Sequence, residues 1–100
     1  MSDFESQIRD LRERTESNRR DFIRAELQTC SIAVDRGHFE LSLGDRDEAE
    51  KEFAIAHRGA QVIEKFLSEG PRQIPELEAR LPALKASIES LRAEIDAYLR

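Results

Sequence analysis

The chain has 100 residues, of which 37% are charged and 39% hydrophobic, and its formal net charge is −5. This length suits a single domain over residues 1–100, because two halves would each be too small to build a core. The apolar residues are mostly Leu, Ile and Ala, and the abundant Glu and Arg are also strong helix formers. Composition therefore predicts an all-α fold.

The distribution of charge argues against a nucleic-acid partner. Phosphate binding needs clustered positive charge, whereas the Arg-rich stretch 9–24 carries acids at helical pairing distances. No apolar run is long enough to span a membrane, and the first residues, MSDFESQI, lack the pattern of a secretory signal. Together with the single cysteine, Cys30, these features predict a cytoplasmic protein without a membrane partner.

A first helix is predicted over about residues 3–43, and Ser2 with Glu5 has the spacing of a capping box at its start. Residues at alternating spacings of four and three share one face. They are Phe4, Ile8, Leu11, Thr15, Asn18 and Phe22. Beyond residue 22 the apolar stripe moves to a face rotated by about 100°. The helix therefore either breaks near residues 15–18 or continues and changes neighbours, and the absence of Gly and Pro before Gly37 favours continuity.

A tight turn and a second helix follow. Gly44 can adopt the left-handed conformation that ends a helix, and Asp45 with Glu48 has the spacing of a second capping box. The second helix is predicted over about residues 46–69, with Gly70 and Pro71 as its stop signal. Its two apolar stripes indicate two helical neighbours.

A third helix is predicted over about residues 75–99, with Pro75 in its first turn and a kink or short break before Pro82. Its apolar residues follow a heptad spacing typical of a two-stranded seam. They are Ile74, Leu77, Leu81, Leu84, Ile88, Leu91 and Ile95. This seam either packs on the second helix of the same chain or binds a second chain.

The charges beside the seam favour one orientation if two chains meet there. A parallel pair would place Arg80 opposite Lys85, which is repulsive. An antiparallel pair can bring Glu78 near Arg92 and Arg80 near Glu94. The intermolecular alternative is therefore an antiparallel homodimer, with the seam as its partner-binding surface.

The hairpin resembles one tetratricopeptide repeat over about residues 33–61. The residues that carry the resemblance are Gly37, Gly44, Asp45, Ala49, Phe53 and Ala56. The resemblance implies two closely packed helices, with small residues at the contact and an aromatic ring between them. Ala33, Arg36, Glu40 and Gln61 depart from the family pattern and no second copy occurs, so a peptide-binding array is not expected.

Little in the sequence indicates catalysis, a metal or a cofactor. Cys30 lies on an apolar stripe, where a small buried thiol is expected. His57 has in outline the surroundings of a phosphoaccepting histidine, but the Leu and Lys usual in phosphotransfer domains are missing.

The sequence thus predicts three helices in an antiparallel bundle, with a long first helix, a tight hairpin at Gly44 and a Pro82-kinked third helix. The predicted function is a non-enzymatic protein–protein interaction module whose partner is a second copy or a helical segment of another protein. One alternative is a small helical chaperone or adaptor that masks a partner helix with its acidic hairpin end. That acidic patch comprises Asp45, Asp47, Glu48 and Glu52. The other alternative is a histidine phosphotransfer protein that uses His57.

Overall fold

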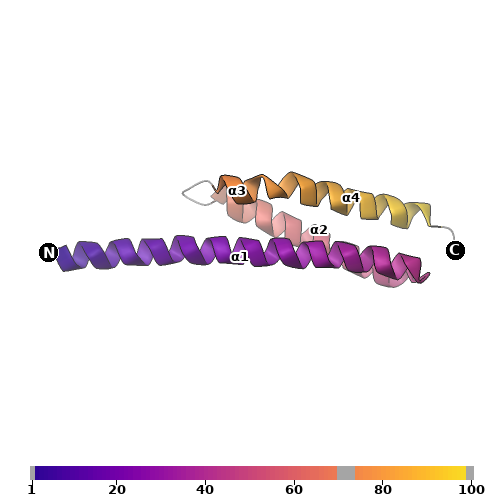
Figure 1. Cartoon of the computed structure of the whole chain (residues 1–100), viewed down its shortest axis with the longest axis horizontal. Coiled ribbons are helices and arrows are strands. Elements are labelled where there is room, and N and C mark those ends of the chain that lie inside the picture. Colours follow the sequence, from indigo (N-terminus) through magenta and orange to yellow (C-terminus); the bar gives the residue numbers. More distant parts are fainter. Residues whose placement is uncertain (1, 70–73, 99–100) are drawn as a thin grey trace.

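The structure, a computed structural model, describes residues 2–69 and 74–98. It contains α1 (Ser2–Ser42), α2 (Arg46–Glu69), α3 (Pro75–Glu78) and α4 (Arg80–Ala97), and no strand within these residues. Three rods result, because α3 and α4 together form the third predicted helix (Figure 1). The prediction of an all-α helical bundle is confirmed. Two predicted signals, the side chain of Ser2 and the stop at Gly70 and Pro71, lie outside the described residues.

The turn between α1 and α2 closes as the sequence predicts. Gly44 has a φ of 83°, and the backbone N–H groups of Gly44 and Asp45 donate to the carbonyls of Leu41 and Glu40 at 3.0 and 2.8 Å. These two bonds define a Schellman motif. Asp45 then caps α2 by accepting a bond from the N–H of Glu48 at 3.0 Å. The reciprocal half of the capping box does not form, because the N–H of Asp45 is already bonded to Glu40.

The first helix is continuous through residues 15–18 and is 41 residues long. Thr15 does not interrupt it, since its hydroxyl donates to the carbonyl of Leu11 at 2.9 Å, one turn earlier in the same helix. The change of apolar face beyond residue 22 therefore reflects a change of neighbours along one helix.

The third rod is interrupted at Ala79, three residues before Pro82. Pro82 has no N–H to donate to the carbonyl of Glu78, and its ring crowds that carbonyl. Ala79 stays in the right-handed helical region, with φ −66° and ψ −24°, so the chain changes direction only slightly (Figure 1). The predicted interruption is present, and α4 continues the same apolar seam.

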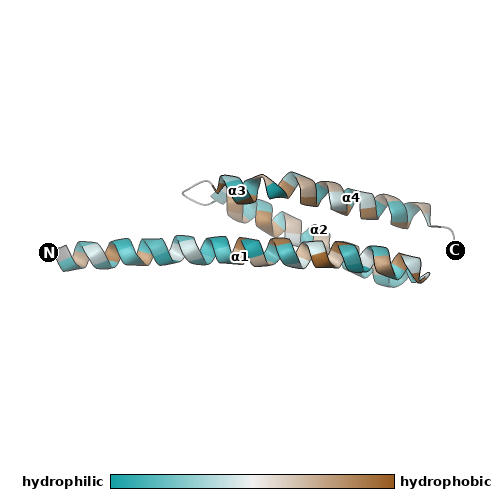
Figure 2. Ribbon diagram, in the orientation of Figure 1, coloured by the Kyte–Doolittle hydropathy of each residue, from teal (hydrophilic) through white to brown (hydrophobic). Residues whose placement is uncertain are grey.

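The core occupies only part of the molecule, whose principal extents are 69 × 18 × 16 Å. In the described residues no side chain before Ile23 is buried, and α2 and α4 pack along the remainder of α1. Residues 2–18, here called the free half of α1, project beyond the other helices and are mostly hydrophilic (Figures 1 and 2). None of the helices in the described ranges is both long enough and apolar enough to cross a membrane.

Candidate interaction surface

The heptad seam of the third rod is buried inside the chain. Leu91 and Ile95 are fully buried, and Leu81 is the only member that stays partly exposed. The seam packs against both α1 and α2, and a Cβ at Gly37 of α1 would lie 2.6 Å from Leu91 Cδ2. The prediction that these residues form a partner-binding surface therefore does not fit this arrangement, because they already form the core of one chain.

The charges beside that seam are also used within the chain. Arg92 forms a bidentate pair with Glu50, with both N–O distances at 2.9 Å, and its guanidinium lies over the ring of Phe53. His38 Nδ1 donates to the carboxylate of Glu94 at 2.6 Å. These contacts hold α4 onto α1 and α2. They replace the intermolecular pairs that the antiparallel seam would have formed.

Two of the four residues of the acidic patch have local structural roles. Asp45 caps α2, and Glu48 pairs with Lys51 at 2.8 Å, a hydrogen bond that raises the pKa of Lys51. Within the described residues no ion pair is formed by Asp47 or Glu52. Among those residues, no group of three or more His, Cys, Asp or Glu side chains is placed to hold a metal ion. Recognition of a partner by this patch stays a prediction.

His57 lies exposed on α2. Its ring stacks on Phe53 with centroids 5.5 Å apart, and its Nε2 is 3.5 Å from the amide nitrogen of Gln61. A histidine on the flank of a helix commonly makes such contacts. They do not test the phosphotransfer alternative.

Cys30 is fully buried at the contact between α1 and α2, opposite Gly59. Burial raises the pKa of its thiol, and the carboxylate of Glu26 raises it further. Because the thiolate is the reacting species, we expect iodoacetamide to alkylate Cys30 in the folded chain about 100-fold more slowly than in urea. Mass spectrometry of timed samples measures this ratio. Equal rates in the two states would contradict the buried position.

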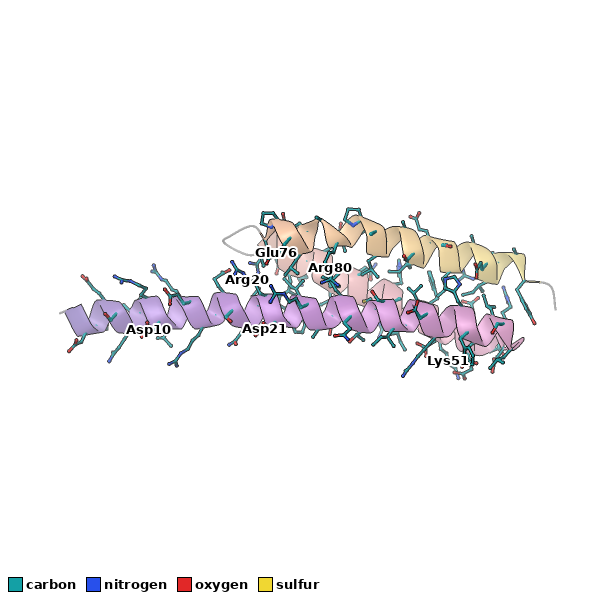
Figure 3. The ribbon with its side chains drawn as sticks, viewed as in Figure 1. Asp10, Arg20, Asp21, Lys51, Glu76 and Arg80 are labelled. Atoms are coloured by element: carbon teal, nitrogen blue, oxygen red, sulfur yellow. The ribbon has the colours of Figure 1, made fainter. Side chains whose placement is uncertain are left out.

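The free half of α1 carries an exposed apolar stripe at helical spacing. Phe4 and Leu11 are 66% and 60% exposed, and Ile8 lies between them on the same face. Around Asp10 its side chains stand out into solvent with no other element beside them (Figure 3). With Thr15, Asn18 and Phe22 these residues form what we call the N-terminal seam.

The N-terminal seam runs directly into the contact between α1 and α2. Phe22, its last member, packs on Phe66 of α2 with ring centroids 4.7 Å apart. Three residues earlier, Arg19 donates to the carbonyls of Phe66 and Leu67 at 3.0 and 3.5 Å, as cations do at helix C-termini. The side of α1 that contacts α2 within the bundle is therefore left uncovered along residues 4–18.

The sequence pattern indicates this apolar stripe but does not show that no other helix covers it. The available signal was length, because a 24-residue α2 cannot cover a 41-residue α1. No pattern in the sequence indicates the role of Arg19, because that role depends on where α2 ends in space.

Comparison with protein-family models, curated proteins and solved structures found no match to this chain. The likeness of the hairpin to a tetratricopeptide repeat thus stays a resemblance.

Proposed function

We propose that this chain is a non-enzymatic helical protein–protein interaction module, and that its binding surface is the N-terminal seam. The observation that carries the proposal is the exposure of Phe4 and Leu11 on a helix half that no other part of the described chain covers. Apolar side chains at alternating spacings of four and three are the pattern by which one helix binds another. A reducing, cytoplasmic setting belongs to the same proposal, supported by the buried free thiol of Cys30.

The face beside the seam supports a single partner helix. Within the bundle, α1 contacts α2 on one side and α4 on the other. In the free half, the side that continues toward α2 carries Phe4, Ile8 and Leu11, while the side that continues toward α4 carries Arg9, Glu13 and other charged residues. A second helix would therefore find apolar contacts only on the α2 side.

The size of the seam sets the expected affinity. Only three large apolar side chains lie on its uncovered part, residues 4–18, so the interface belongs to the small, transient class. We expect self-association with a dissociation constant on the order of 10–100 µM, because binding must also offset the lost freedom of the partners.

The test of this proposal is Leu11→Glu. Glu is nearly as good a helix former as Leu, so the helix should persist while a charge enters the middle of the seam. We expect association to weaken about 100-fold or more, because each dimer loses two central anchors. Sedimentation velocity from low micromolar to millimolar concentration measures this, and the melting temperature should not change.

A matched control is Ser6→Glu, which adds the same charge on the opposite side of the helix. This variant should associate like the wild type. A wild-type chain that stays monomeric throughout the concentration range, or an equal loss in both variants, would refute self-association through the N-terminal seam.

A further inference from the structure

We infer that the occupant of the N-terminal seam is the free half of a second copy of this chain, packed antiparallel. This inference rests on the proposed self-association and adds to it the direction and the register of the pair. It follows from three features: the position of α2, the continuity of α1 and the charges beside the seam.

The position of α2 excludes a parallel pair. The seam ends at Phe22, whose ring packs on Phe66 of α2, and α2 lies along α1 beyond that residue. In a parallel pair the partner's α1 would continue unbroken along the same line and would collide with α2, because α1 has no break over Ser2–Ser42. In an antiparallel pair the partner's α1 instead runs outward past Ser2, away from the bundle. Only the antiparallel direction therefore leaves room for both α2 helices.

The same position selects the register. Antiparallel helices pair an a residue with a d residue of the partner. With Ile8 at a and Leu11 at d, one register places Ile8 opposite the partner's Leu11. In this register Asp3 lies opposite the partner's Glu16. The overlap of the two helices therefore ends before Arg19, where the contact with α2 begins. The next register, one heptad along, would place Phe4 opposite the partner's Phe22, a position that Phe66 already occupies. The free halves therefore pair about a two-fold axis between residues 9 and 10.

The charges of the chain agree with this register. Residues at e positions face each other across an antiparallel pair, which places Glu5 opposite the partner's Arg12 twice per dimer. Neither side chain forms an ion pair within the described part of its own chain. At the g positions, Gln7 meets the partner's Arg14 without repulsion. A parallel pair would instead place Arg14 opposite the partner's Arg19, again twice.

Charge reversal tests the partner and the register together. Glu5→Arg and Arg12→Glu should each weaken the dimer about five- to tenfold, because two attractive pairs become repulsive. The double variant, and an equimolar mixture of the two single variants, should both recover wild-type association. Glu13→Arg, on the opposite side of the helix, is the matched control and should have no effect. Failure of the double variant to recover association would overturn the pairing of Glu5 with Arg12.

Cross-linking tests the direction. Ile8→Cys and Leu11→Cys are made separately, each with Cys30→Ala, and are oxidised with glutathione disulfide alone and as a mixture. The antiparallel pair predicts that the mixed disulfide, identified by mass, exceeds the share given by random pairing. Predominance of the two symmetric disulfides would show a parallel pair and overturn the inference, while the N-terminal seam would remain the binding surface. If sedimentation showed no association that depends on the N-terminal seam, by contrast, the proposed function itself would be overturned.

Small-angle scattering gives a second readout. Two chains that overlap only by their free halves would form a particle about 110 Å long, at 1.5 Å per helical residue, whereas a single chain is 69 Å long. A dimer no longer than the monomer would place the bundles side by side and overturn the inference.

Discussion

Leu91→Ala is expected to lower the free energy of unfolding by about 3–5 kcal/mol. Leu91 is fully buried, and its methyl groups lie on the surface left open by Gly37 of α1. The truncated side chain would leave a cavity between α4 and α1 that neither helix can close without losing other contacts. Equilibrium unfolding in urea, followed by circular dichroism, measures the loss.

The same experiment shows whether the heptad seam of the third rod lies inside one chain or between two chains. Leu81 is the matched control, since it belongs to the same heptad but is only partly buried, and Leu81→Ala should cost about 1 kcal/mol. For both variants the midpoint should not depend on the concentration of protein over a range where the chain is monomeric. If Leu91→Ala instead preserved the midpoint and abolished association, the seam would lie between chains.

Gly59→Ala is expected to destabilise the chain although alanine is the better helix former. A Cβ at residue 59 would overlap the Sγ of Cys30, so α1 and α2 must move apart or Cys30 must change its rotamer. Overpacking of this kind costs about 1–3 kcal/mol, against a gain of about 1 kcal/mol from helix propensity. We expect a net loss of about 1 kcal/mol, the middle of the range of about 0–2 kcal/mol that these two effects leave, measured by urea unfolding.

Two further variants separate the steric cause from a general effect of glycine replacement. Gly59→Ala combined with Cys30→Ala removes the overlapping atom and should be more stable than Gly59→Ala alone. Gly37→Ala should cost less than Gly59→Ala, because its neighbour is the flexible end of Leu91, which can turn aside. A double variant no more stable than Gly59→Ala would contradict the close approach at Cys30.

The local structure was predictable from local residues. Gly44 and Asp45 determine the turn because a left-handed glycine and a side-chain cap act within a few positions of themselves. Pro82 predicts the interruption at Ala79 for the same reason, since its effect reaches only one turn back.

The partners of each apolar face were not predictable to the same degree. A heptad pattern shows which face of a helix is buried but not which helix covers it. The pattern around Leu84 and Leu91 is therefore the same for a single-chain bundle and for a dimer. The continuity of α1 was also open, because Thr15 can bond the backbone of a helix as readily as it can end one. Both questions depend on contacts between residues distant in sequence.

The free half of α1 has a further consequence for the energetics of the chain. Its backbone hydrogen bonds are supported by no tertiary contact in the described structure, and a helix of about 17 residues is only marginally stable alone in water. Amide hydrogens there should exchange through local fraying, at an opening free energy far below that of the bundle. Helix ordering and association would then form one coupled equilibrium, in which part of the binding free energy orders the helix.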